Sequence, residues 1–246
     1  MRLAVISDIH GNLPALEAVL ADIARMGADV IANLGDILSG PLEPARTADR
    51  LMALDLPTIA GNHERQLLTF GDDRINPTDA FTKNALSDQQ LDWLRSLPAT
   101  LSLSDEVFLC HGTPANDLDC LIEDVTPEGL RRSDASSVEM KAGHIEAELI
   151  LCGHTHVPGI VLLPDGRTVA NPGSVGLQAY RDNVPFPLLV ENGSPHARYM
   201  LAERQNGRWS FRQMYVEYDW DAAAALAIKN GARDWAVALA TGRMAS

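Results

Sequence analysis

The chain has 246 residues, of which 46% are hydrophobic and 22% charged, a balance typical of a folded globular protein. Its formal net charge of −13 disfavours a nucleic acid polymer as partner, because an acidic surface repels phosphates. A small phosphorylated substrate stays compatible with this charge, since a bound cation reverses the local field.

The sequence indicates a reducing, aqueous compartment. Its three cysteines are widely spaced and form neither a disulfide framework nor a CxxC pair. The opening MRLAVISDIHGN has too short an apolar run for a signal peptide, and no run approaches the length of a membrane span. We therefore expect a cytoplasmic protein with no membrane partner.

The first third alternates apolar runs with helical patterns. Residues 3–7 predict a buried strand, and Asn12 is suited to cap a helix that starts at Leu13 and ends at Gly27. Residues 28–34 and 56–60 predict further strands, with a helix over residues 44–52 between them. This alternation with short links predicts parallel strands in an α/β layer.

The rest of the chain mixes helices and strands. Residues 63–97 are polar and helical, and residues 117–143 are irregular with weak helical signals. Five apolar runs predict strands at residues 99–104, 106–110, 148–152, 159–164 and 168–173. Residues 187–216 predict antiparallel strands with a hairpin at Asn206-Gly207, followed by an alanine-rich helix capped by Asp219 or Asp221.

Polar side chains follow the predicted strands at their carboxyl ends. Ligands bind at this edge in open α/β sheets, so we expect these residues to converge although they span roughly 150 positions. The set consists of Asp8, His10, Asp36, Asn62, His63, His111, His154 and His156. Each short motif alone is compatible with an ordinary turn, but their shared placement favours one site.

The residue types in this set indicate a metal centre. Carboxylate, imidazole and amide ligands without thiolate suit Mn²⁺, Fe, Zn²⁺, Co²⁺ or Ni²⁺ rather than a cysteine-rich structural zinc site. Seven such ligands exceed what one ion needs. Two ions about 3.5–4 Å apart form a clamp for displacement at phosphorus, and they lower the pKa of a bridging water.

The series DIH, GD, GNHE, HG and GHTH resembles the calcineurin-like metallophosphoesterase superfamily over roughly residues 1–176. Within it, the chain is similar to small bacterial phosphodiesterases and to relatives that cleave diadenosine polyphosphates. The resemblance implies an α/β fold, a four-layer αββα sandwich of two mixed sheets. It also implies hydrolysis of a small phosphodiester or dinucleoside polyphosphate by a hydroxide that bridges two metal ions, with manganese favoured. We expect a single domain over residues 1–246, with residues 177–246 packed on the motif-bearing part as strands and a helix.

The resemblance assigns a role to each motif residue. The expected ligands of the first ion are Asp8, His10 and His156. Those of the second ion are Asn62, His111 and His154. Asp36 bridges the two ions, and His63 is a non-ligand that contacts the phosphate or protonates the leaving oxygen. Glu64 has two interpretations, either orienting His63 or lying solvated.

The chain departs from the protein phosphatases of this superfamily. Ala60 stands where they carry an arginine, and ILSGP follows Asp36 in place of their DRG element, so two phosphate-binding arginines and a supporting aspartate are missing. Arg181 is the favoured substitute for phosphate binding; Arg65, Arg131 and Arg132 are alternatives.

Two further interpretations stay open. One is a phosphomonoesterase of the same fold; the other is a non-enzymatic, protein-binding scaffold, which the complete ligand set disfavours. The terminal helix offers a surface for a homo-oligomer.

Overall fold

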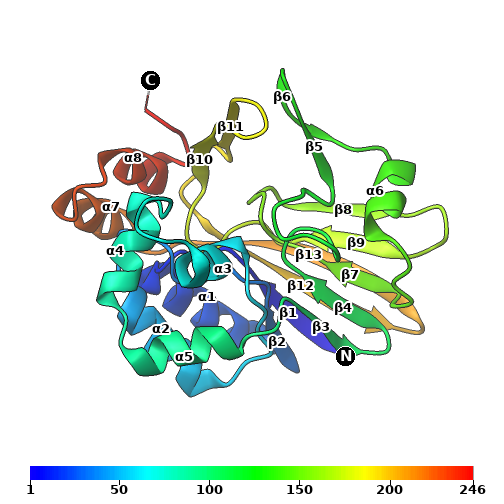
Figure 1. Cartoon of the computed structure of the whole chain (residues 1–246). Coiled ribbons are helices and arrows are strands. Elements are labelled where there is room, and N and C mark those ends of the chain that lie inside the picture. Colours follow the sequence, from blue (N-terminus) through cyan, green and yellow to red (C-terminus); the bar gives the residue numbers. More distant parts are fainter. Residues whose placement is uncertain (246) are drawn as a thin grey trace.

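Two facing β-sheets form the centre of the protein, with helices on their outer faces (Figure 1). The computed structural model describes residues 1–245. The first sheet has the order β13-β12-β1-β2. Its strands are β1 Arg2–Ile6, β2 Val30–Asn33, β12 Ala197–Gln205 and β13 Arg208–Val216. The second sheet has the order β3-β4-β7-β9-β8. Its strands are β3 Thr100–Ser104, β4 Val107–Cys110, β7 Leu149–Leu151, β8 Gly159–Leu162 and β9 Thr168–Asn171.

Three buried apolar clusters separate the layers. One lies between the sheets, where Leu3 and Val5 of β1 meet Leu149 and Leu151 of β7. The second packs helices α1 Leu13–Met26, α2 Pro44–Leu54 and α5 Asp88–Ser96 on the first sheet. The third packs α6 Ala135–Ala142 on the second sheet. The order helix, sheet, sheet, helix confirms the expected four-layer sandwich.

The local signals of the first helix are confirmed. The side chain of Asn12 accepts a hydrogen bond from Ala15 N at 3.2 Å, which satisfies one of the free N–H groups at the helix start. Gly27 ends the helix with a positive φ of 72°. The apolar stripe of the helix faces the sheet because its members recur every three to four residues.

Parallel pairing brings the motif-bearing loops to one edge. Strand β1 pairs with β2 in parallel, and β7 pairs in parallel with both β4 and β9. The carboxyl ends of these strands therefore point to the same end of the sandwich. The mixed character of the first sheet comes from β12, which pairs with β1 antiparallel.

Three predictions of secondary structure were wrong. Residues 56–60 form no strand, only a bridge from Thr58 to Asn33, because the chain turns at once into α3 Asn62–Thr69. The segment 117–143 contains a hairpin of β5 Glu123–Thr126 and β6 Gly129–Arg132 before α6. Strand β10 Ala179–Asp182, paired with β11 Leu188–Glu191, was missed. These hairpins lie outside the sandwich, so no apolar run marks them.

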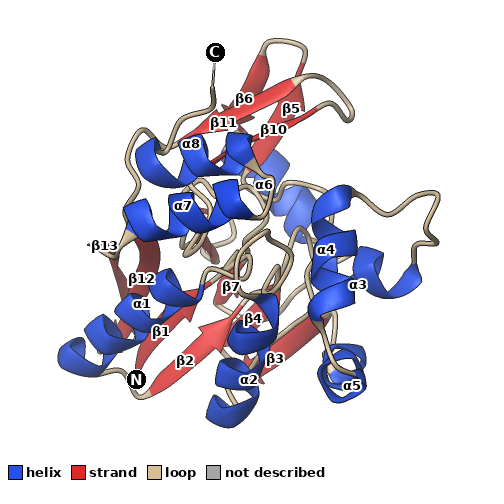
Figure 2. Cartoon of the chain, turned by 90° about the vertical axis from the view of Figure 1, so that its left-hand side faces the viewer, coloured by secondary structure: helices blue, strands red, loops and turns tan. Residues whose placement is uncertain are grey.

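The remaining helices lie around the strand ends (Figure 2). The polar stretch after His63 splits into α3, α4 Pro77–Ala85 and α5, with Asn76 and Ser87 as caps. The predicted hairpin at Asn206-Gly207 is confirmed by positive φ values of 51° and 76°. Asp219 caps α7 Trp220–Lys229, and α8 Arg233–Thr241 follows. None of the helices in residues 1–245 has both the length and the apolar character needed to cross a membrane.

Candidate metal centre and catalytic site

The loops after the strands hold their functional residues in an unusual backbone conformation. Five of the eight expected site residues have a positive φ of 51–69°, in the left-handed region that non-glycine residues seldom adopt. They are Asp8, His10, Asp36, His154 and His156. Such strain costs on the order of 1–3 kcal/mol per residue and clusters at functional sites. The strained backbone conformation therefore serves to orient these five side chains.

The first cluster consists of Asp8, His10 and His156, all buried. The Nδ1 atom of His10 contacts Ser39 O at 2.7 Å, and that of His156 contacts Leu177 O at 2.7 Å. A carbonyl can only accept, so each Nδ1 carries the proton and each Nε2 carries a lone pair. The two Nε2 atoms lie 3.1 Å apart, and His156 Nε2 lies 3.4 Å from Asp8 Oδ1.

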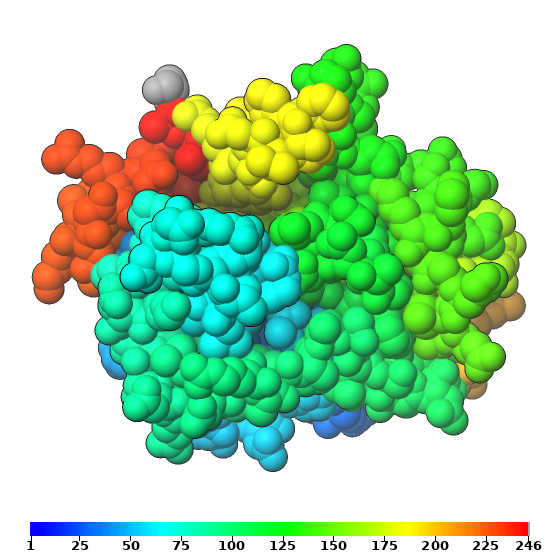
Figure 3. All heavy atoms as spheres, in the orientation of Figure 1, coloured from blue at the N-terminus to red at the C-terminus, as the bar shows by residue number. Residues whose placement is uncertain are grey.

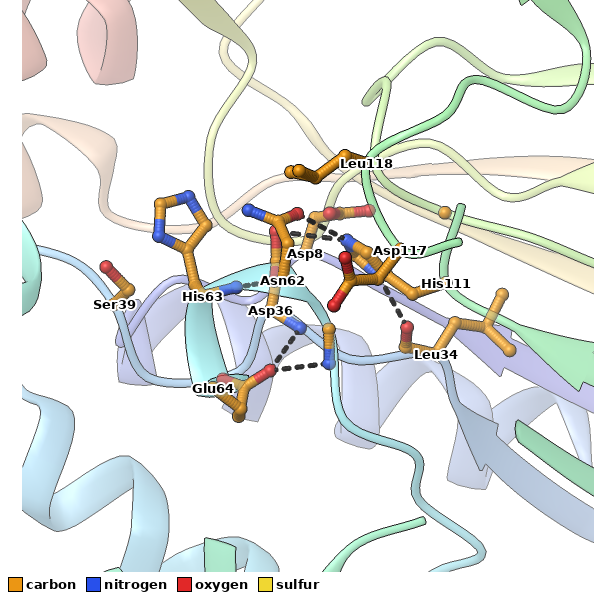
Figure 4. A network of polar contacts seen from close by, with 12 residues as sticks. Asp8, Leu34, Asp36, Ser39, Asn62, His63, Glu64, His111, Asp117 and Leu118 are labelled. Atoms are coloured by element: carbon orange, nitrogen blue, oxygen red, sulfur yellow. Dashed lines mark hydrogen bonds and ion pairs between the residues drawn. The ribbon is translucent and has the colours of Figure 1, made fainter. Parts of the chain in front are cut away.

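The second cluster joins Asp36, His111 and His154 with Asn62 (Figure 4). His111 Nδ1 contacts Leu34 O at 2.7 Å, which turns its Nε2 toward Asp36 Oδ2 at 3.1 Å. The carboxamide oxygen of Asn62 faces His111 Nε2 at 3.2 Å and His154 Nδ1 at 2.9 Å. Oxygen and nitrogen atoms from four residues thus converge on one point.

These residues fit divalent cations. Neither carboxylate oxygen of Asp8 accepts a hydrogen bond from residues 1–245, although the side chain is fully buried. A buried, ionised carboxylate without a partner lowers the stability of the fold, and so does the repulsion between the lone pairs of His10 Nε2 and His156 Nε2. A cation in each cluster removes both costs, and the oxygen and nitrogen donors match the predicted metals.

The electrostatics of the clusters agree with metal binding. Burial and the neighbouring His156 lower the pKa of His10 to about 4, and burial with His111 lowers that of His154 to about 4. Both are therefore neutral near pH 7, as metal ligands must be. For His111, the carboxylate of Asp36 outweighs burial and raises the pKa to about 10. A proton on His111 therefore competes with the ion of the second cluster.

His63 stands beside the clusters and is held by a buried aspartate. Its Nδ1 contacts Asp79 Oδ1 at 2.9 Å, and its side chain is 26% exposed. Burial disfavours the charge on His63, but Asp36 and Asp79 together raise its pKa to about 9. Asp79 is itself buried and accepts hydrogen bonds from Ser39 Oγ and from Asn76 Nδ2. Because Nδ1 is engaged, the Nε2 atom of His63 is left for a ligand.

Residues 1–191 match the sequence profile of the calcineurin-like phosphoesterase superfamily domain. The chain belongs to this superfamily. It is a metal-dependent phosphoric ester hydrolase.

Individual relatives agree with this membership. An uncharacterized protein of Methanocaldococcus jannaschii, MJ0912, is 28% identical over 257 residues, which cover 95% of this chain and 94% of the relative. The phosphodiesterase YfcE of Escherichia coli is 39% identical over 77 residues, 27% of this chain and 42% of YfcE. A solved metallophosphoesterase from Sphaerobacter thermophilus superposes with a TM-score of 0.76 at 26% identity, covering 98% of this chain and all of that one.

This phosphoesterase lacks the DRG motif and its aspartate, as the sequence shows. The carboxylate that contacts His63 comes instead from Asp79, which belongs to no motif recognised in the sequence. Asp79 lies in the first turn of α4, 16 positions after His63. A capping pattern at Asn76 marks the helix start, but no sequence signal connects the aspartate with His63.

Glu64 fits neither interpretation made from the sequence. It is buried, and its carboxylate accepts hydrogen bonds from the backbone N–H groups of Asp36, Ile37 and Gly61 at 2.8–2.9 Å. Glu64 thus ties the loop of Asp36 to the start of α3. Gly61 is required here, because a Cβ at this position would lie 2.2 Å from Asp36 Oδ1.

All four arginines considered for phosphate binding are otherwise engaged, Arg131 with Glu128 at 3.8 Å and Arg132 with Glu123 at 3.3 Å. Arg65 forms a bidentate pair with Asp117, with distances of 2.6 and 2.8 Å. Arg181 donates to Ala245 O at 2.6 Å. Neighbouring residues of a strand point to opposite faces of the sheet. The ring of Tyr180 lies 4.8 Å from that of His156, so the next residue, Arg181, points away from the metal ligands. The structure therefore does not bring Arg181 together with the metal ligands.

The C-terminal part of the phosphoesterase forms one wall of the site. The ring of Trp235, in α8, lies 5.9 Å from that of His10. Trp235 and Tyr180 pack against the same small apolar cluster. On the other side, Leu118 lies over the metal ligands (Figure 4) and is 48% exposed. The sequence left the C-terminal wall open, because it comes from a segment without a motif.

Proposed function

We propose that this phosphoesterase is a dinuclear-metal enzyme that hydrolyses a small phosphodiester or a dinucleoside polyphosphate. The observation that carries the proposal is the pair of adjacent clusters in which oxygen and nitrogen atoms of metal-ligating residue types converge. Asp8, His10 and His156 would hold the first ion. Asn62, His111 and His154 would hold the second, and Asp36 would be shared by the two.

The chain's own groups then bind, orient and protonate the substrate. When bound, two divalent ions, with manganese the first choice, supply Lewis-acid activation of water and of the phosphoryl oxygens. The carboxylate of Asp79, which faces Nδ1, favours the protonated form of His63 and raises its pKa. Its Nδ1 is fixed by Asp79, so the proton on Nε2 is directed outward, where it can pass to the leaving oxygen.

The surroundings of the centre favour a diester over a monoester. A terminal phosphate carries up to two charges and calls for additional cationic donors. Arg65 is paired with Asp117, and Arg181 is bonded to the C-terminal segment. The local similarity to a protein named a phosphodiesterase points the same way. The substrate is thus a small phosphorylated compound with a single charge at the reacting phosphorus.

Activity measurements with three substrates test this proposal. The metal-stripped protein is assayed with bis-p-nitrophenyl phosphate, p-nitrophenyl phosphate and diadenosine tetraphosphate, with and without Mn²⁺. We expect Mn²⁺-dependent turnover, faster for a diester or the dinucleotide than for the monoester. The His63→Ala variant should retain its metal and lose about 10²–10⁴-fold in rate.

The outcomes separate the alternatives. Preference for p-nitrophenyl phosphate would establish a phosphomonoesterase instead. Two bound ions per chain without turnover of any substrate would support the protein-binding scaffold. Loss of metal in His63→Ala would contradict its role as a non-ligand.

A further inference from the structure

A cavity of about 460 Å³ lies beside the metal centre, between α3 and the loop that follows β4. Its volume is in the range of sites for small organic ligands. Its lining includes Arg65, Ala99, His111, Ala115, Asp117 and Leu118. A hollow between these segments is visible on the surface (Figure 3). Apart from His111, the proposed mechanism gives no role to the residues that line this cavity.

The cavity begins at the metal centre. His111 lines it and also belongs to the second metal cluster. Asp117 and Leu118 line the same cavity as His111, and Asp117 lies beside His111 in Figure 4. An ester group attached to phosphorus at the second cluster therefore enters the cavity directly.

The loop that walls the cavity is already in its final shape. Thr113 N donates to Asn116 O at 2.7 Å, and Leu118 N donates to Asn116 Oδ1 at 2.7 Å. Gly112 permits this tight course, since a Cβ there would lie 2.6 Å from Asn116 O. A preformed wall binds a ligand without a cost of ordering the loop.

The charges in the cavity suit a neutral, planar group. The guanidinium of Arg65 is neutralised by both oxygens of Asp117, so the pair adds no net charge. A bidentate pair of this kind is flat, and flat guanidinium surfaces stack on aromatic rings. Ala99, Ala115 and Leu118 supply apolar contact. The cavity therefore offers no unpaired cation to bind a second phosphate group. It does offer a nucleobase a flat guanidinium surface for stacking and apolar side chains for contact.

We propose that this cavity binds the nucleoside part of the substrate, with the base against the Arg65–Asp117 pair. The identification rests on the proposed function, because it places the ester group relative to the metal clusters. It narrows the substrate class to nucleoside esters of phosphate and makes Arg65 a specificity residue instead of a phosphate ligand.

A binding experiment tests the cavity without the reaction. Saturation-transfer NMR measures contact of adenosine with the metal-free protein. Ala115→Trp fills the cavity from the loop, and Ala99→Trp fills it from the opposite wall. Ala53→Trp is the matched control, because Ala53 is an exposed alanine that lines a separate hollow on α2.

We expect adenosine signals for the wild type and for Ala53→Trp, and a loss in both cavity-filling variants. Ribose should give no signal in any of them. Absence of adenosine signals from the wild type, or signals unchanged in both filled variants, would overturn the proposal.

Kinetics with Mn²⁺ separate this inference from the proposed function. For a thymidine p-nitrophenyl phosphodiester, Ala115→Trp should raise KM about tenfold, the effect of losing one base contact, with a small change in kcat. For methyl p-nitrophenyl phosphate, KM should not change. Equal KM changes for both esters would refute the base pocket, whereas no turnover by the wild type would refute the proposed function and leave the NMR result to decide on the cavity.

Discussion

The replacement of Asp79 by asparagine isolates the electrostatic support of His63. Asparagine keeps the shape of the side chain and an acceptor oxygen, but it removes the charge that faces His63 Nδ1 at 2.9 Å. A hydrogen bond to a charged partner contributes about 1.5–3 kcal/mol. If about 2 kcal/mol of this is lost in the transition state, kcat falls about 30-fold.

The loss should depend on the leaving group. Proton donation by His63 matters most for a poor leaving group, such as the nucleoside alkoxide released from thymidylyl-thymidine. It matters least for p-nitrophenolate, which leaves readily without a proton. We therefore expect the 30-fold loss with thymidylyl-thymidine and a much smaller one with bis-p-nitrophenyl phosphate. The pKa of His63 should also fall, because a carboxylate that raises it is gone. Activity that needs protonated His63 is lost as pH rises through this pKa, so the alkaline limb of kcat should move to lower pH.

A matched control and the metal content complete this experiment. Asp88→Asn changes an exposed aspartate in the first turn of α5, as Asp79 lies in the first turn of α4, and should leave kcat unchanged. Both variants should bind as much Mn²⁺ as the wild type. Equal losses with both substrates, or an unmoved alkaline limb, would refute the view that Asp79 acts through the proton of His63.

Three other variants test separate parts of the structure. Asp36→Asn should reduce Mn²⁺ from two ions per chain to one or fewer by elemental analysis; retention of two would disprove the bridge. Gly61→Ala should lower the Tm and the metal content together, because its Cβ would lie 2.2 Å from Asp36 Oδ1; a normal metal content would show that the loop can shift. Glu123→Gln should raise the free energy of unfolding at pH 8 but not at pH 4. Burial, only partly offset by Arg132, raises the pKa of Glu123 from 4.5 to about 7, so ionisation destabilises the fold increasingly from pH 4.5 to 7, by up to about 3 kcal/mol. Denaturant titrations measure this free energy of unfolding. If the difference between Glu123→Gln and the wild type is the same at both pH values, the raised pKa of Glu123 is contradicted.

Local patterns in the sequence were sufficient for the first helix and for most strands of the two sheets, whereas the four-layer sandwich followed only from the family resemblance. The helix from Leu13 was predictable because its cap, apolar stripe and terminal glycine are close in sequence. The short apolar runs of β1, β4 and β7 are buried between layers, which requires apolar residues at nearly every position. Several candidate metal ligands were predictable for a related reason: Asp8, His111 and His154 come shortly after β1, β4 and β7, and parallel strands end at one edge.

What the sequence left open depends on contacts between distant segments. Residues 56–60 have the composition of a strand, but whether they pair along their length depends on the path of the chain into α3. The hairpins β5–β6 and β10–β11 are stabilised by packing outside the sandwich, so no periodic pattern reports them. The roles of Glu64 and Arg65 were likewise decided by their partners Asp36 and Asp117, which only the fold brings near.

The sequence by itself determined the chemistry of the centre, because residue types and their place after strands fix which atoms can bind a metal. The tertiary structure decided what surrounds that chemistry. Asp79 behind His63, Trp235 beside His10 and the cavity beyond His111 each join segments from separate parts of the chain. Substrate choice depends on the distances between such segments, and those distances are set by packing instead of by any local pattern of residues.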